Sequence, residues 1–228
     1  MSIEENLKNV RERIGKAALV AGRDPREIKL VAVIKKVATE QVFQALAAGV
    51  DAVGENRVQE AQARYKIILE KFPAVGYHMI GHLQRNKVGQ ALDMFDIIQS
   101  VDSERLMEEI NQRATKIVPI LIEVNTSGEA SKFGVDPETT IALARFASSL
   151  EKIKVRGLMT IGPLTTDPGK IRSSFKKLKE LKNRIAAAGF PGVEMKYLSM
   201  GMSDDFEIAI EEGSNLLRIG RAIFSQPA

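Results

Sequence analysis

Short apolar segments alternate with longer amphipathic segments along most of the chain. Continuous apolar runs are typical of strands that are buried on both faces of a parallel sheet. They predict strands at residues 29–34, 52–54, 76–80, 97–100, 118–124, 155–159, 194–198 and 215–219.

Between these strands, apolar residues recur at the three- and four-residue spacing of amphipathic helices. The helices predicted from this spacing are 39–48, 57–71, 85–92, 103–115, 137–150, 168–188 and 203–212. One more helix is expected before the first strand, over residues 3–21, because Gly22 and the Asp24-Pro25 turn follow it.

The order of these elements predicts an α/β fold: a (β/α)8 TIM-type barrel with an extra N-terminal helix. The alternative is a doubly wound open sheet, which more often has a glycine-rich turn after its first strand. Residues 33–37 contain no glycine. No linker rich in Pro, Gly or Ser interrupts the alternation, so residues 1–228 are expected to form a single domain.

Composition narrows the class of protein. The chain has no cysteine, which excludes disulfides and thiolate metal sites. Its acidic N-terminus is unlike a signal peptide, and no apolar run approaches the roughly 20 residues of a membrane span. We therefore expect a cytoplasmic protein with no membrane partner.

The charge balance indicates an ordinary solvated surface. The net charge is +4, from 33 basic and 29 acidic residues mixed along the whole length, and aromatic residues make up only 5%. A nucleic-acid interface would favour a concentrated basic stripe with stacking aromatics. The densest basic segment, residues 176–182, has helical apolar spacing and is interpreted as an exposed helix face, so no nucleic-acid partner is expected.

Lys35 is the first candidate for chemistry. The apolar run 30–34 ends in Lys35-Lys36, at the carboxyl end of a predicted strand, where barrels place their reactive groups. A lysine that is partly desolvated there would have a lowered pKa and a free amine for Schiff-base formation. A lysine at a strand end can also be an ordinary solvent-exposed residue with no chemical role. Side-chain alternation allows only one of the two lysines to point into the barrel, and the period does not choose between them.

The last two strands supply a candidate phosphate site. Barrels often bind phosphate there, with the N-terminus of a short helix. Ser203 is predicted to be an N-cap, and Gly220 would let the backbone approach an anion closely. Asp204 and Asp205 would repel a phosphate unless their carboxylates point away. The alternative is a capped helix and a tight turn with nothing bound.

Arg218 ends the last strand and is expected to present a permanent cation to the barrel opening. It could form a salt bridge with a neighbouring carboxylate, or pair with the nitrogen of a pyridine ring. A guanidinium there would keep that nitrogen unprotonated and make the ring a poor electron sink. His78 and His82 are four residues apart but straddle a strand end, so no metal site is expected. Lys132 is a candidate for either surface or site.

Several motifs together resemble the pyridoxal phosphate homeostasis proteins, which are relatives of the alanine racemase barrel domain. They are VAVIK (31–35), GENRVQE (54–60), HMIGHLQRNK (78–87), VNTSGE (124–129) with Lys132 and Gly134, RGLM (156–159), LSMGMSDD (198–205) and RIGRAIF (218–224). They cover nearly the whole chain in order.

The resemblance implies that pyridoxal 5'-phosphate is bound covalently, as a Schiff base on Lys35. It also implies a set of cofactor-binding residues with no catalytic residue among them: Asn56 beside the cofactor, phosphate contacts from Ser199, Ser203 and the Gly220-Arg221 backbone, Met202 within the same motif, and Arg218 at the ring nitrogen. The sequence departs from the family at Ile34, where serine is usual, at residues 36–38, and at Arg221, which replaces a hydroxyl residue.

Three functions follow from these residues. The first is a non-enzymatic carrier that binds pyridoxal phosphate, takes part in its homeostasis and hands it to pyridoxal-phosphate-dependent apo-enzymes. The alternative is a weak amino-acid racemase, which would need a second base; racemases resembling this barrel use a tyrosine from a further domain, and we expect none after Ala228. The third is a barrel that binds a phosphorylated metabolite without a covalent bond. Without the dimerising domain of the racemases, a monomer is expected.

Overall fold

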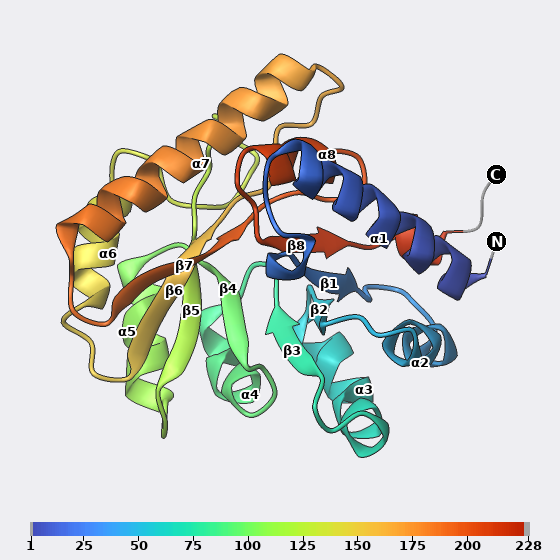
Figure 1. The fold of residues 1–228 in the computed structure, drawn as a ribbon. Coiled ribbons are helices and arrows are strands. Elements are labelled where there is room, and N and C mark those ends of the chain that lie inside the picture. The colour runs from blue at the N-terminus through green and yellow to red at the C-terminus, as the bar shows by residue number, and fades with distance from the viewer. Residues whose placement is uncertain (1, 226–228) are drawn as a thin grey trace.

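The strands form one closed parallel barrel in chain order (Figure 1). The computed structural model describes residues 2–225. Its strands are β1 (Lys29–Val33), β2 (Ala52–Glu55), β3 (Gly76–Met79), β4 (Ile97–Val101), β5 (Val118–Glu123), β6 (Ile153–Met159), β7 (Val193–Ser199) and β8 (Leu216–Ile219). β1 pairs with both β2 and β8, so the sheet has no free edge. The predicted (β/α)8 barrel is confirmed, and the open sheet is excluded.

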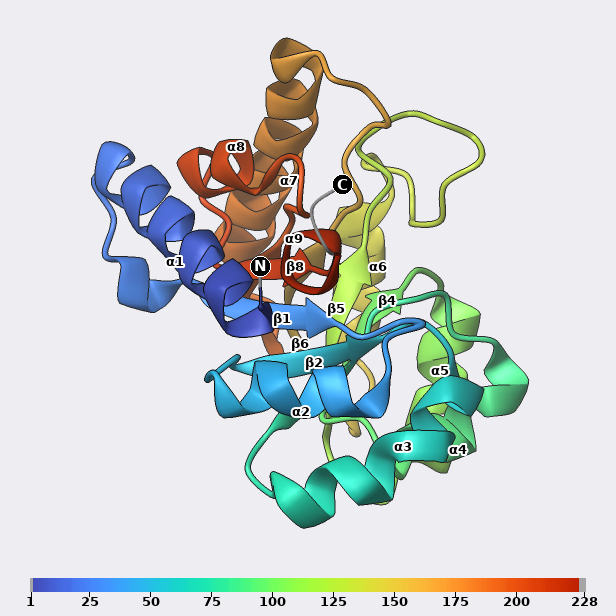
Figure 2. The same ribbon diagram turned by 90° about the vertical axis from the view of Figure 1, so that its right-hand side faces the viewer.

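Helices surround the barrel (Figure 2). They are α1 (Ile3–Val20), α2 (Thr39–Ala47), α3 (Val58–Lys71), α4 (Val88–Leu92), α5 (Glu104–Arg113), α6 (Thr140–Ala147), α7 (Pro168–Ala188), α8 (Phe206–Glu211) and α9 (Arg221–Phe224). Short 3-10 turns lie at Pro25–Glu27 and Arg85–Lys87. No helix in residues 2–225 is both long and apolar enough to cross a membrane.

Three predicted helices begin three residues later than expected. The segment 85–92 begins as the 3-10 turn and becomes α-helical only in α4, and the segment 137–150 is helical only in α6. The segment 203–212 becomes the six-residue α8, whose N-cap is Asp205 rather than Ser203. In each case the residues before the first apolar position form turns. The prediction missed this because helical periodicity locates the buried face of a helix better than its ends.

The extra N-terminal helix α1 packs on the outside of the barrel, beside α8 and α9 (Figures 1 and 2). Ser2 and Glu5 form a capping box at its start, with Glu5 N donating to Ser2 Oγ at 3.1 Å. Its apolar stripe, including Leu7, Val10 and Ile14, is buried. The prediction of this helix is confirmed.

The barrel interior changes from apolar to polar along the strands. One apolar layer fills it: Val31, Ala52, Ile97, Leu121, Met159 and Leu216. Side chains two positions further along a strand point to the same face. On β4, β5 and β8 these are Gln99, Glu123 and Arg218, which are all buried. The polar layer lies toward the carboxyl ends of the strands, which we call the C-terminal mouth.

Candidate functional site

Two cavities at the C-terminal mouth share Lys35. The first, of about 540 Å³, is lined by six of the predicted residues: Lys35, Met202, Ser203, Arg218, Gly220 and Arg221. The second, of about 690 Å³, joins Lys35 to Asn56 and His82. The structure therefore brings together residues from both ends of the sequence, and only Ser199 among the predicted residues lines neither cavity.

A tight turn presents Lys35. β1 ends at Val33, and Val37 N donates to Ile34 O at 3.1 Å across the turn. Lys36 has φ 58°, the left-handed region that a side chain with a Cβ seldom occupies. Lys35 is exposed, so the partial burial predicted for it is wrong. Lys36 lines only the first cavity, whereas Lys35 lines both.

Arg64 from α3 holds this turn from outside the barrel. Its Nη1 donates to Ile34 O at 3.2 Å and to Val37 O at 2.9 Å, which are the two ends of the turn. Its Nε lies 3.2 Å from Oε1 of Glu55, and both side chains are largely or fully buried. The guanidinium thus links the turn that presents Lys35 to the end of β2.

Glu55 has an unusual ionisation. It is fully buried, and burial raises its pKa to about 7, although Arg64 acts in the opposite direction. The hydroxyl of Tyr77 is also buried, with no hydrogen-bond partner in the described part of the chain, and burial followed by the Glu55 charge raises its pKa. This cluster lies between the barrel and α3, beneath the lysine turn.

Arg218 is fixed in the polar layer of the barrel. It is 4% exposed, its Nη1 donates to Ser199 Oγ, and its Nη2 donates to Thr160 O at 2.7 Å. Burial lowers its pKa to about 10, with Glu123 and Asp205 acting in the opposite direction, so it stays protonated at neutral pH. The salt bridge considered for it does not occur: no carboxylate in residues 2–225 lies within ion-pair distance of it. Two of its five N–H groups are used here, which leaves others for the first cavity.

Glu123 is the carboxyl group whose charge acts most strongly on the pKa of Arg218. Burial raises its pKa to about 7; Asp102 adds to this shift and Arg218 opposes it. A carboxyl group that is half-protonated at neutral pH can accept or donate a hydrogen bond. It therefore balances the arginine without forming a direct ion pair.

Ser199 lies below the cavity. Its side chain is fully buried; the hydroxyl accepts from Arg218 and lies 2.6 Å from Oε1 of Gln99. Both partners of the hydroxyl are other side chains, and no surface of the residue is exposed. In this arrangement Ser199 orients Arg218, and its direct contact with phosphate stays a prediction.

The loop 200–205 and α9 form the other wall of the first cavity. Ser203 Oγ accepts from Ala222 N at 3.2 Å, and Asp205 Oδ1 accepts from Met202 N at 2.6 Å. Ser203 therefore ties the loop to α9 and does not cap α8. Asp204 pairs with Arg221 at the exposed edge, which partly neutralises the carboxylate expected to repel an anion.

Gly220 allows the start of α9 to lie close to the end of β1. A Cβ at this position would lie 3.3 Å from both Cβ and O of Val33. A larger residue would therefore push the start of α9 away from β1 and from Lys35. This observation supports the importance given to Gly220 from the sequence.

The second cavity contains Asn56 and His82. Asn56 Oδ1 is buried without a hydrogen-bond partner in the described residues, so its amide is available to a ligand. His82 lies 3.6 Å from Asp102 through Nδ1, and its ring stacks on Phe133 with centroids 4.2 Å apart. No group of three or more metal-binding side chains gathers anywhere in residues 2–225. Lys132 pairs with Glu129 at 3.1 Å.

Three residues of this site were not found from the sequence. Gln99 and Glu123 alternate with Ile97 and Leu121 on strands, and a polar residue at an inward position of an apolar strand is a signal that could have identified them. Arg64 had no such signal, since an arginine on an amphipathic helix normally faces solvent.

Comparisons with known proteins identify the family of this chain. The family model described as alanine racemase, N-terminal domain, matches residues 2–227. A pyridoxal phosphate homeostasis protein of Aquifex aeolicus (strain VF5) is 40% identical over 229 residues, which cover 99% of each chain. A crystal structure of an unknown protein from Bifidobacterium adolescentis is 39% identical with a TM-score of 0.95, over 97% of this chain and 94% of that one. The structure of PipY from Synechococcus elongatus PCC7942 with PLP bound is 31% identical with a TM-score of 0.85, over 98% of this chain and 100% of PipY. The chain therefore belongs to the alanine racemase N-terminal domain family and, within it, to the group of pyridoxal phosphate homeostasis proteins.

Proposed function

We propose that this protein binds pyridoxal 5'-phosphate at the C-terminal mouth of its barrel and takes part in pyridoxal phosphate homeostasis as a carrier, not as an enzyme. The observation that supports this most is the cavity of about 540 Å³ that is lined by Lys35, Arg218 and Ser203, residues that carry an amine, a guanidinium and a hydroxyl. The PLP-bound relative PipY has the same fold over its whole length.

Lys35 is the residue that would hold the cofactor covalently. Its amine would form a Schiff base with the aldehyde, with loss of one water. The turn that presents Lys35 is held by Arg64 through Ile34 O and Val37 O, which limits the positions that the amine can reach. Preorganisation of this kind lowers the entropy lost on binding.

The phosphate and the ring have separate partners. Ser203, Arg221 and the backbone at Gly220 line the cavity beside α9 and would hold the phosphate, while Met202 lines the same wall. Arg218 would donate to the ring nitrogen and Asn56 would lie beside the cofactor. When bound, pyridoxal phosphate supplies an aldehyde and a conjugated ring that can accept electrons. Arg218 has no acceptor atom and keeps the ring nitrogen unprotonated, which limits that capacity.

The proposal of no enzymatic role rests on the lack of a tyrosine base beside Lys35 in the described residues. Racemisation needs a proton acceptor on each face of the substrate carbon. None of the three tyrosines of the chain lines either cavity that contains Lys35. His82 shares the second cavity, and we assign it no role in proton transfer. If the loaded protein exchanged the α-proton of alanine rapidly in deuterated water, the carrier proposal would be wrong.

Borohydride trapping tests the ligand, the bond and the residue together. The protein is loaded with pyridoxal phosphate, reduced, digested and analysed by mass spectrometry. We expect one modified peptide, with the added mass on Lys35, and visible absorbance before reduction. Lys35→Ala should abolish both signals, and the neighbouring Lys36→Ala is the matched control that should retain them. A colourless wild-type protein, or full labelling of Lys35→Ala, would contradict the proposal.

The proposal also includes a single barrel domain over residues 1–228 that acts as a monomer and hands the cofactor to apo-enzymes that depend on it. Light scattering measures the oligomeric state. Transfer to an apo-enzyme, followed by the recovery of that enzyme's activity, should be faster from the loaded protein than from an equal concentration of free cofactor.

A further inference from the structure

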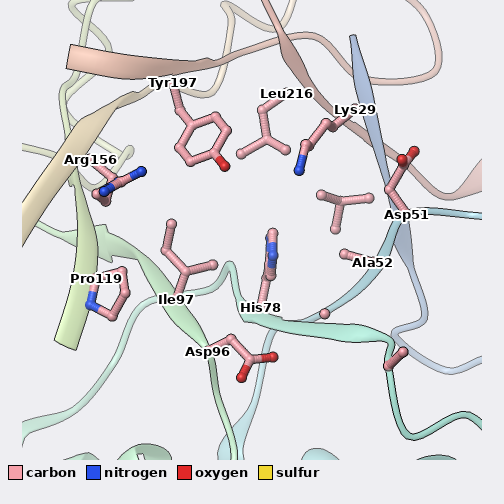
Figure 3. Close-up of a pocket in the computed structure, with 13 residues that line it drawn as sticks. Lys29, Asp51, Ala52, His78, Asp96, Ile97, Pro119, Arg156, Tyr197 and Leu216 are labelled. Carbon is pink, nitrogen blue, oxygen red and sulfur yellow. The ribbon is translucent and has the colours of Figure 1, made fainter. Parts of the chain in front are cut away.

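A second cavity lies at the opposite end of the barrel, where the strands begin. It measures about 390 Å³, and every strand of the barrel contributes to its lining (Figure 3). We call this end the N-terminal mouth. Lys29, His78, Arg156 and Tyr197 come to it from β1, β3, β6 and β7, with the apolar layer as its floor.

The polar groups that point into this cavity are mostly hydrogen-bond donors. In Figure 3 the amine of Lys29, the guanidinium of Arg156 and the hydroxyl of Tyr197 are directed toward the space above His78. Lys29 is exposed and forms no ion pair within residues 2–225. Arg156 pairs with Glu194 on one side, at 2.9 Å from Nη1.

The two carboxylates at the edge are engaged elsewhere. Asp51 Oδ2 accepts from Leu30 N at 2.9 Å, and Asp96 Oδ2 accepts from Tyr77 N at 2.8 Å. Both carboxylates lie at the rim and turn away from the centre of the cavity (Figure 3). The centre therefore presents cations and N–H or O–H donors without a carboxylate directed at it.

The hydrogen-bond network fixes the proton on His78. Arg218 can only donate, so Ser199 Oγ accepts from it and is free to donate its own hydrogen to Gln99 Oε1, 2.6 Å away. Gln99 then directs its NH₂ to His78 Nδ1 at 2.8 Å. The reverse orientation of the amide would leave the serine hydrogen without an acceptor. Nδ1 of His78 is therefore an acceptor, and its proton is on Nε2, which can donate to a ligand in the cavity.

We propose that the N-terminal mouth binds a small oxyanion, the carboxylate or phosphate group of a metabolite, through Lys29, Arg156, Tyr197 and Nε2–H of His78, and that occupancy affects Arg218 through Gln99 and Ser199. The binding part stands on its own, whereas its consequence for the cofactor rests on the proposed function. An anion beside Lys29 offsets the ammonium charge that acts on His78.

The coupling follows from the donor and acceptor roles in the hydrogen-bond network. Burial and the Lys29 charge lower the pKa of His78 to about 4, so the empty site holds a neutral ring. An anion favours the protonated ring, in which Nδ1 also carries a hydrogen and can no longer accept from Gln99. The amide must then turn, Ser199 loses its acceptor, and the hydroxyl that orients Arg218 reorients. The charged groups around His78 that take part are Lys29, Asp51, Asp96 and Arg156.

Histidine-ring NMR on the protein loaded with pyridoxal phosphate tests the site, because the cofactor then occupies the C-terminal mouth. The probes are inorganic phosphate and acetate, titrated separately against ¹⁵N-labelled histidine rings. We expect one of them to shift the His78 signals in a saturable way, and which one does so identifies the anion class. Lys29→Ala should weaken that response at least fivefold, and Lys116→Ala, an exposed lysine outside the cavity, should not. No saturable shift with either probe, or an unchanged response in Lys29→Ala, overturns the site.

The coupling is tested by cofactor exchange. The loaded protein is mixed with excess isotopically labelled pyridoxal phosphate, and the first-order rate of exchange is measured with and without the anion. We expect at least a twofold change in wild type and none in Ser199→Ala, although His78 should still respond to the anion in that variant. Equal rates in wild type overturn the coupling. If wild type binds no pyridoxal phosphate, the proposed function fails, and the His78 titration of the cofactor-free protein still decides the anion site.

Discussion

Replacing Glu55 by glutamine tests how the barrel tolerates a carboxyl group beneath the lysine turn. Burial raises the pKa of Glu55 from an ordinary 4.5 to about 7 in the folded protein, with Arg64 opposing the shift. The folded state therefore holds this proton more tightly than the unfolded chain does. The resulting stability is fully present below pH 4.5 and is lost as the pH rises through 7.

The size of the effect follows from the shift. Each pKa unit corresponds to about 1.4 kcal/mol, so the contribution of Glu55 falls by about 2–3 kcal/mol between roughly pH 5 and pH 8. For a chain of this length, that loss corresponds to roughly 5–10 °C in Tm. Glu123 has its pKa raised to about 7 by burial as well and should add a similar slope.

The assay is urea unfolding at pH values across this interval, for wild type and Glu55→Gln. Glutamine has nearly the same shape but cannot ionise, so the difference in unfolding free energy between the two proteins should change by about 2–3 kcal/mol over the interval. Glu70→Gln, on the exposed surface of α3, is the matched control and should follow wild type. If the unfolding free energies of wild type and Glu55→Gln change in parallel with pH, burial does not raise the pKa of Glu55 as described, and the reasoning fails.

Further substitutions test the residues that support the site and the backbone packing around it. Arg64→Ala should lower the unfolding free energy, measured with urea, by about 2–4 kcal/mol at alkaline pH, because the buried carboxylate of Glu55 loses its partner. It should also slow the labelling of Lys35 in borohydride trapping. Lys66→Ala on the same helix is the control and should change neither result. Gly81→Ala should cost at least about 2 kcal/mol, because the new Cβ would lie 2.4 Å from Asn56 O. Gly15→Ala, in open space within a helix, should instead stabilise by about 0.5–1 kcal/mol in the same thermal or urea assay.

The fold was accessible from the sequence because a parallel barrel buries its strands on both faces. The run 30–34 is wholly apolar, its counterparts carry only a few polar positions, and helices with clear apolar stripes separate them. Helix starts were less accessible. At 203–212, Ser203 is a favourable cap by residue type, but its hydroxyl accepts from Ala222 N, and α8 begins after Asp205, which makes no side-chain cap hydrogen bond.

The candidate site was accessible only in part. Lys35 and Gly220 follow strand ends and Arg218 lies one residue before the end of β8, so the topology alone gathers them at one mouth. Arg64 reaches the turn from a helix, across long side-chain torsions that the sequence does not determine. The exposure of Lys35 was also mispredicted, because the strand ends two residues before it and the chain turns outward.

The polar layer of this barrel is best explained by its effect on Arg218. A barrel under selection for stability alone would fill its interior with branched apolar side chains, as the layer beneath does. Here Gln99 and Ser199 are buried at that level and satisfy each other and Arg218. Each buried polar group costs desolvation free energy, which its hydrogen bonds only offset. What the arrangement adds is a guanidinium held in one position and unable to accept a proton, a property that suits the proposed role of holding a pyridine ring without activating it.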